Sequence, residues 1–227
     1  MLRTALLCSL LFLNGWANAE SEPYNRADFQ VDAAREAAND LLVAVMSVEM
    51  QDKQPSRVAQ QLNATINDAL KKAAAFSAIK VSSGIQSTYP VYGKNNQIDA
   101  WRGHAEIRLE SRDFKAAGEL IMLLQSTMQL GNVQFTIAPD TRTQIENALI
   151  TEAIKAFQMR ADAIRVALGA TSYKTVHLSI NGEGGMPTYR PSMTMRAAMA
   201  DTAISAPEFA AGDSRITVQI NGTIEMQ

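Results

Sequence analysis

The chain has 227 residues, of which 47% are hydrophobic, and it carries a formal net charge of −2 at neutral pH. A chain of this length can bury a core of its own. A mildly acidic charge argues against partners such as nucleic acid or anionic lipid, which a basic surface would attract. Composition therefore indicates a globular protein and excludes the strongly basic binding classes.

The first 19 residues have the pattern of a secretory signal peptide. Arg3 supplies the positive charge, residues 5–13 form a short apolar run, and Ala17-Asn18-Ala19 is a small-x-small cleavage site. The apolar run has about half the length of a membrane-spanning helix. We therefore expect cleavage after Ala19, export to the periplasm and a mature chain without a transmembrane segment.

The mature chain is expected to lack thiols, because Cys8 is the only cysteine. This excludes disulfides and thiolate sites. No linker rich in Pro, Gly or Ser divides residues 20–227. We therefore expect a single domain over residues 20–227, with a Met/Ala-rich loop at residues 184–211.

The N-terminal half of the mature chain predicts four strands and one helix. Residues 29–51 indicate two strands joined by a turn at Asn39-Asp40, and the second is apolar on both faces between Leu41 and Met46. A helix over residues 56–75, a strand over 79–91 and a return strand over 97–109 follow. Their expected core positions are Val58, Leu62, Ile66, Leu70 and Ala73 in the helix, Ile79, Val81, Ile85, Tyr89 and Val91 in the first strand, and Trp101, Ala105, Ile107 and Leu109 in the second.

The C-terminal half predicts two further helices. Asp113 is the expected N-cap of the first, and Gly131 lies in its expected C-cap region. Thr143-x-x-Glu146 has the spacing of a capping box and predicts the start of the longest helix, which ends at Gly169. The apolar stripes expected to face the core are Phe114, Ala117, Leu120, Ile121, Leu124 and Met128 in the first helix, and Ile145, Leu149, Ala153, Phe157, Ile164 and Leu168 in the second.

Three more strands complete the predicted order. They are a short strand over residues 133–138, one over 176–180, and a final strand over 215–227 in which apolar and polar residues alternate strictly. The resulting order, ββαββαβαβ-loop-β, lacks the regular alternation of βαβ units. It predicts an α+β fold in which helices pack on a mostly antiparallel sheet.

Two histidines are the first candidates for chemistry. His104 and His177 fall on the polar sides of their predicted strands, and neither has a ligand partner next to it in the sequence. Histidine serves as a general base or metal ligand, but the chain contains neither Gly-x-Ser-x-Gly nor His-Glu-x-x-His. We therefore expect solvated histidines, no catalytic, cofactor-binding or metal-binding residue, and no enzymatic activity.

Gly182-Glu183-Gly184-Gly185 follows a predicted strand, as a phosphate-binding loop would. Such a loop leads directly into the N-terminus of a helix, whose N–H groups meet the anion. Pro187, Tyr189 and Pro191 follow here instead. The segment is better interpreted as a flexible turn.

Met186, Met193, Met195 and Met199 make the 184–211 loop rich in thioethers. Thioethers are soft ligands that suit Cu(I), and the Met193-x-Met195 spacing suits one shared ion, although the loop has no histidine. Methionines also form adaptable apolar contacts with partner surfaces, and they can be oxidised sacrificially. The sequence alone leaves copper binding, assembly and oxidation as alternatives.

Three segments resemble the SIMPL-domain family, which includes periplasmic immunogenic proteins and oxidative-stress-defence-like proteins. They are Asn39-Asp40 with the apolar strand after it, the helix over 143–168 with its closing Leu168-Gly169, and the tail. The tail contains Glu183-Gly184-Gly185, Pro187-x-Tyr189-x-Pro191, Met193-x-Met195-Arg196-Ala197-Ala198-Met199 and Ala211-Gly212-Asp213. The resemblance implies a secreted, non-enzymatic α+β protein, some of whose relatives assemble into hollow homo-oligomers.

Two functions follow as expectations. The first is a periplasmic protein that assembles with copies of itself through sheet edges and the Met-rich loop, with an indirect role in envelope or oxidative stress tolerance. The second is a binding module for a small ligand, a peptide or copper, in which residues 184–211 act as a lid.

Overall fold

The computed structural model describes residues 24–182 and 209–227, which form two antiparallel sheets and three α-helices. The elements in chain order are β1 (Arg26–Ala38), β2 (Leu41–Asp52), α1 (Pro55–Ala73), β3 (Ile79–Tyr92), the short 3-10 turn η1 (Lys94–Asn96), β4 (Ile98–Ser111), α2 (Phe114–Leu124), β5 (Gln129–Thr136), α3 (Pro139–Ala167), β6 (Tyr173–Gly182) and β7 (Asp213–Met226). The α+β class and the order of the elements are confirmed.

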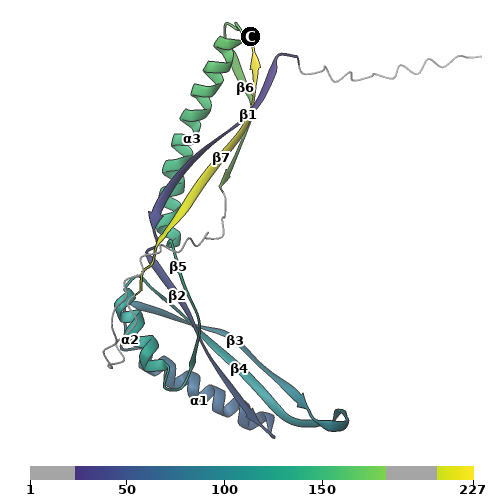
Figure 1. Ribbon diagram of the computed structural model, residues 1–227, viewed down its shortest axis with the longest axis vertical. Coiled ribbons are helices and arrows are strands. Elements are labelled where there is room, and N and C mark those ends of the chain that lie inside the picture. Colours follow the sequence, from purple (N-terminus) through teal and green to yellow (C-terminus); the bar gives the residue numbers. More distant parts are fainter. Residues whose placement is uncertain (1–23, 183–208) are drawn as a thin grey trace, which may run out of the picture.

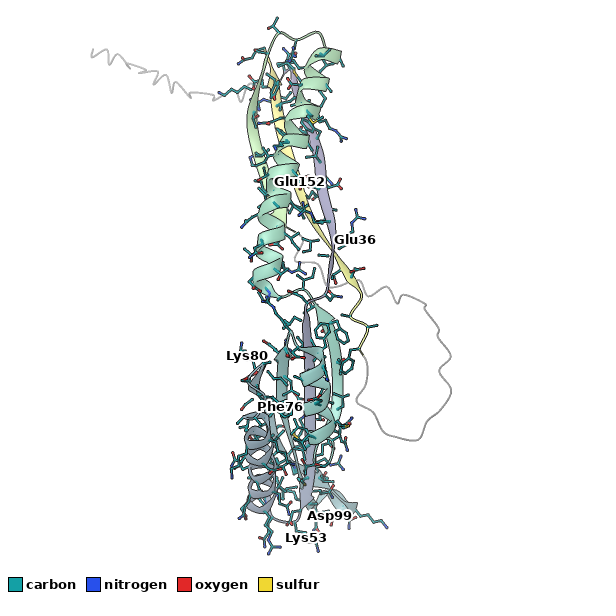
Figure 2. The ribbon with its side chains drawn as sticks, turned by 90° about the vertical axis from the view of Figure 1, so that its left-hand side faces the viewer. Glu36, Lys53, Phe76, Lys80, Asp99 and Glu152 are labelled. Carbon is teal, nitrogen blue, oxygen red and sulfur yellow. The ribbon has the colours of Figure 1, made fainter. Side chains whose placement is uncertain are left out.

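The two sheets lie end to end and give the molecule an elongated shape (Figure 1). The four-stranded half has the strand order β3-β4-β2-β5 and carries α1 and α2 on one face. The three-stranded half has the order β1-β7-β6 and carries α3. In Figure 2, Glu36 and Glu152 mark the three-stranded half, and Lys53 and Asp99 mark the far end of the other.

The core of the four-stranded half lies between its sheet and the two helices. Val43 is buried as well as Leu42 and Ala44, which confirms that the start of β2 is covered on both faces. Gly103 lets α1 approach β4 closely, because a Cβ there would lie 2.4 Å from Val58 Cγ1. The largest fully buried side chains of this core are Leu42, Met46, Leu62, Ile107, Leu109, Leu120, Ile121 and Leu124.

The core of the three-stranded half lies between α3 and the central strand β7. The alternation predicted for β7 is confirmed, since its apolar residues are buried against α3. Gly222 leaves room for the Phe157 ring, because a Cβ at Gly222 would lie 2.4 Å from Phe157 Cε2. That ring stacks on Phe29 of β1 at 4.6 Å between centroids. The buried residues of this core are Val31, Ile137, Leu149, Ala153, Phe157, Ala161, Ile216, Val218, Ile220 and Ile224.

Two predicted helix boundaries are wrong. The α3 helix begins at Pro139, before the expected capping box, and the Thr143 hydroxyl instead donates to the Pro139 carbonyl at 2.8 Å. The α2 helix ends at Leu124, and Gly131 lies within β5 rather than at a C-cap. In contrast, Asp113 caps α2 as predicted, with its carboxylate accepting from the Ala116 N–H at 2.9 Å.

Several residues expected in the core are exposed instead. Tyr89 is exposed because the register of β3 shifts between Ser83 and Gln86, so that Gln86 pairs with the buried Ala105 and Tyr89 pairs with Arg102 on the outer face of the sheet. Ile85 lies within this irregular segment and is exposed as well. Leu70 is exposed while Ala69 is buried, so α1 is rotated slightly from the predicted stripe. Leu168 is exposed because α3 ends at Ala167, close to the predicted end at Gly169.

The two halves are joined where β1 leads into β2. These consecutive strands do not pair with each other: β1 pairs with β7, and β2 pairs with β4 and β5. The predicted turn at Asn39-Asp40 therefore connects two sheets rather than two strands of a hairpin. The chain passes the same region again between β5 and α3.

Asp40 holds the start of α3 across this joint. Its Oδ1 accepts a hydrogen bond from the Ala138 N–H at 2.6 Å, and its Oδ2 accepts one from the Thr141 hydroxyl at 2.6 Å. Ala138 is the N-cap position of α3 and has no side chain that can cap. A carboxylate from another part of the chain thus supplies the acceptor and the negative charge that a helix N-terminus favours.

Arg112, which follows β4, adds an ion-pair network to the joint. Its guanidinium lies 3.7 Å from Asp40 Oδ2 and also pairs with Asp140 in the first turn of α3. Burial alone would raise the pKa of Asp40, but the Ala138 and Thr141 hydrogen bonds and the Arg112 charge together lower that pKa. The pKa of Asp140 is lowered chiefly by its hydrogen bond from Arg112. The ionised carboxylates are therefore the forms that hold the joint.

Replacing Asp40 with alanine should destabilise the fold. The Ala138 N–H and the Thr141 hydroxyl would lose their acceptor, and losses of this kind at helix N-termini cost about 1–2 kcal/mol. We expect Asp40→Ala to lower the free energy of unfolding in urea by about that amount. Asp32→Ala is the matched control, because Asp32 is exposed in β1 away from the joint. An equal loss in the two variants would contradict a specific role for Asp40.

Acid should remove this contribution. Because the pKa of Asp40 is lowered in the folded chain, its stabilisation is present above the unfolded-state pKa of about 3.9 and is lost as pH falls through the folded-state pKa. The unfolding free energies of wild type and Asp40→Ala should therefore differ equally at pH 7 and pH 5, and should converge below about pH 4. A gap that is undiminished at pH 3 would show that the carboxylate charge is not responsible.

Candidate functional site

A cleft of about 430 Å³ lies at the joint between the two sheets. One wall is the end of β5, and the other is the segment that leads into β7. The lining residues are Asn39, Asn132, Val133, Gln134, Phe135, Ala210, Ala211, Gly212, Asp213 and Ser214. Ala210 and Ala211 are the last residues of the expected 184–211 loop, so the end of that loop forms part of the cleft.

Asn39 fixes the wall that leads into β7. Its backbone N–H donates to the Gly212 carbonyl at 3.0 Å, and its side-chain amide donates to the Ala211 carbonyl at 2.8 Å. Its Oδ1 accepts from the Ser214 hydroxyl at 2.7 Å. Asn39 and Ser214 are both buried. These bonds hold residues 211–214 in one position and leave the polar atoms of Asn39 occupied.

Aromatic contacts anchor Phe209, just before this wall, to the four-stranded half. Phe135 of β5 lies 5.5 Å from Phe209 and 5.4 Å from Phe114 of α2, measured between ring centroids. Phe209 therefore packs against the core of one half, while Ser214 already pairs within the sheet of the other. The segment between them spans the joint and keeps the cleft open.

The chemistry of the cleft suits binding rather than acid–base catalysis. Among the described residues, Asp213 is the only charged one that lines the cleft, and the amides of Asn132 and Gln134 supply neutral donors and acceptors. β5 is an edge strand, so one side of its backbone pairs with no other strand in the described part of the chain. The volume of the cleft lies within the range of small-molecule pockets. A neutral ligand or an extended peptide that adds to β5 matches these features.

His104 lies on the outer face of the four-stranded sheet, between two carboxylates. Its Nε2 is 2.8 Å from Glu106 Oε1, and its Nδ1 is 3.6 Å from Glu49 Oε1. These partners were not predicted from the sequence, although Glu106 lies two residues from His104 and therefore on the same face of the strand. In the described parts of the chain, no group of three or more His, Cys, Asp or Glu side chains is arranged to hold a metal ion.

His177 lies in the other sheet, so the two histidines do not share a site. It is exposed in β6 opposite Thr223, as expected for the polar face. A shallow depression beside it is lined by Asp28, Asn221 and neighbouring residues. The pairing between β6 and β7 is irregular between Thr175 and His177.

An apolar row is exposed on β6. Val176, Leu178 and Ile180, here called the β6 row, are 43%, 38% and 42% exposed. Val176 lies where the register between β6 and β7 shifts. Leu178 pairs with Gly222 and Ile180 with Ile220, and because directly opposed residues share a face, this part of the row lies on the α3 side of the sheet. It stays exposed because α3 packs mainly on β7 and β1. The alternation predicted this strand correctly but did not predict its exposure.

Two expected features lie outside the described residues. They are the signal peptide at residues 1–19 and most of the 184–211 loop, including Met186, Met193, Met195 and Met199 and the turn at Glu183-Gly184-Gly185. β7 is the central strand of its sheet, so the final strand does not lie at a sheet edge. Among the helices that the structure describes, none has the length and apolar composition needed to cross a bilayer.

Comparison with known proteins adds one finding to this geometry. The chain matches none of the curated proteins with which it was compared. Residues 29–224 match the SIMPL family, which is described as a protein of unknown function (DUF541). The match begins within β1 and ends within β7, and so includes both sheets and the joint. Because it covers most of the sequence, this chain belongs to the SIMPL family.

Proposed function

We propose that this SIMPL protein is an exported, non-enzymatic protein that assembles with copies of itself, with an indirect role in envelope or oxidative stress tolerance. The observation that carries self-assembly is the exposed β6 row, on a strand whose outer side pairs with none of the described strands. The expected signal peptide supports export. The stress role rests on the resemblance to oxidative-stress-defence-like proteins.

Edge strands of monomeric proteins are usually protected from association. Charged side chains that point inward, prolines, strong bulges or a covering loop prevent one edge from pairing with another. β1 follows this rule, because it carries Arg26, Asp28, Asp32, Arg35 and Glu36. β6 has an irregular pairing near Thr175 and one charged residue, Lys174, but no proline, and the three residues of the row are apolar. Such a surface favours association with another chain.

The mass of the exported chain tests this proposal directly. We expect residues 20–227 to form a discrete species of several subunits that survives dilution, because covering the β6 row favours association. Light scattering coupled to size exclusion at two concentrations measures the absolute mass. A monomer at both concentrations would contradict the proposal.

A second candidate function is ligand binding, and the cleft at the joint favours it. The cleft has the volume of a ligand pocket, and Ala210 and Ala211 bring the end of the expected loop to its wall. Copper is a separate possibility for the same loop, because Met193-x-Met195 presents two thioethers. Neither kind of binding requires self-assembly. A binding measurement therefore tests this second function independently of the mass measurement, which tests self-assembly.

Competition for Cu(I) with a colorimetric chelator tests the copper form of this second function. If copper binds through the loop, wild type should remove Cu(I) from the chelator, and Met193→Leu/Met195→Leu should not. Leucine keeps the apolar volume but removes the sulfur ligands. Identical chelator curves for the two proteins would exclude these methionines as a copper site.

A further inference from the structure

β5 lines the cleft and lies at one edge of the four-stranded sheet. The register between β5 and β2 skips Gly131, but residues 132–136 pair regularly with residues 41–45 of β2. On its other side, β5 pairs with no strand that the structure describes. A regular strand edge presents backbone N–H and C=O groups at a fixed spacing and so acts as a template for another extended chain.

The opposite edge of the same sheet is protected against such pairing. That edge is β3, in which the register shifts between Ser83 and Gln86 and which contains Pro90. Bulges and prolines are features that keep a further strand from pairing with an edge. Residues 132–136 of β5, by contrast, are Asn-Val-Gln-Phe-Thr and contain neither a charge nor a proline. The edge of β5 that borders the cleft therefore lacks these protective features.

The segment that leads into β7 forms the other wall of the cleft without pairing with β5. Among the described residues, no backbone hydrogen bond joins β5 to residues 209–214. The side-chain amide of Asn39 holds the Ala211 carbonyl, and Phe209 packs on Phe135, so this wall is already fixed. A preformed site loses less conformational entropy when its ligand binds. The cleft is therefore a preformed slot beside a strand edge.

The side chains along β5 indicate what kind of strand would fit this slot. Val133 and Phe135 pack toward the core, whereas Asn132 and Gln134 are exposed on the other face. A strand that pairs with β5 would place its alternate side chains beside an apolar and a neutral polar surface. Asp213 at the cleft adds a negative charge, which disfavours an acidic ligand. The slot thus matches a strand that alternates between apolar and uncharged polar residues.

We propose that the cleft binds an extended peptide segment that pairs with β5 as a further strand of the four-stranded sheet. Four consecutive residues of β5 line the cleft, so the paired part of the peptide is about four residues, or about 13 Å, long. Its apolar side chains lie on the side of Val133 and Phe135. This inference rests on ligand binding, the second candidate function, and names the class of ligand.

A compact neutral organic molecule is the main alternative ligand. It could contact Val133 and Phe135, which line the cleft, but it would match few of the hydrogen-bonding groups that recur along a strand edge. A peptide backbone matches these groups repeatedly, because paired strands exchange N–H···O=C bonds along their whole length. Backbone pairing therefore favours a peptide over a compact molecule.

Fluorescence anisotropy with two synthetic peptides tests backbone pairing. The probe is fluorescein-labelled Thr-Val-Thr-Val-Thr-Val with an amidated C-terminus, and the control peptide has every internal amide nitrogen methylated. The control keeps the side chains but has no internal N–H to donate. The exported chain, residues 20–227, should bind the probe at least about ten-fold more tightly than the control. Equal affinities would overturn the inference and leave ligand binding in place. Failure of the probe to bind saturably would also overturn it.

A substitution that fills the slot tests where the probe binds. Ala210 is exposed in the wall of the cleft, so Ala210→Trp should lower the affinity for the probe at least about ten-fold. Ala167→Trp is the matched control, because Ala167 is exposed at the end of α3, about 42 Å along the helix from the joint. It should leave the affinity unchanged, with circular dichroism confirming that both variants fold. Unchanged affinity in folded Ala210→Trp would overturn the inference.

Hydrogen exchange in the wild-type chain gives a readout that needs no variant. A saturating concentration of the probe should slow amide exchange in residues 132–136, because N–H groups at the strand edge become hydrogen-bonded. Exchange in residues 86–89 of β3, at the opposite edge, should stay unchanged. Protection confined to another part of the chain would overturn the inference. A monomeric chain that binds the probe as expected would instead remove self-assembly and support this inference.

Discussion

The structure depends on two adjacent residues that connect the sheets. Asn39 binds the segment that enters β7, and Asp40 caps α3 and meets Arg112. These contacts bring together chain segments about one hundred and more residues apart, at a point where neither hydrophobic core extends across. Buried polar groups such as those of Asn39 and Ser214 stabilise a structure only when all their hydrogen-bond partners are present. The two halves, each with its own hydrophobic core, are therefore connected at the joint by hydrogen bonds and an ion pair.

The contacts of Asn39 and Phe209 at the joint determine the position of the cleft. Asn39 holds residues 211–214 against one half, and Phe209 is held by the aromatic cluster of the other, so the short segment between them cannot collapse onto β5. An open space beside an unpaired strand edge results. The end of the Met/Ala-rich loop is thus tied to both halves, and any ligand bound in the cleft would contact the joint itself.

Periodicity predicted the cores and the order of the elements but not the joint. Alternation in β7 and the stripe of α3 are local patterns, so they could be identified from neighbouring residues alone. The partners of Asp40 could not, because Ala138 and Thr141 lie about one hundred residues away and Ala138 has no side chain that signals a cap. The capping-box prediction failed because the N-terminus of α3 is capped by the distant Asp40 and not by a side chain close to it in the sequence. Likewise, Val176, Leu178 and Ile180 have the pattern of a half-buried strand, and only the position of α3 determines that they are exposed.

The exposure of β6 follows from the proportions of its half. Three strands spaced by about 4.8 Å present a sheet roughly as wide as one and a half helices, each about 10 Å across. A single helix can cover two strands of such a sheet, and α3 covers β1 and β7, where Phe157 packs onto Gly222. Moving α3 toward β6 would remove that close packing and break the Arg160 contact with β1. Among the described residues no second helix covers β6, so the apolar side chains of Leu178 and Ile180 stay exposed.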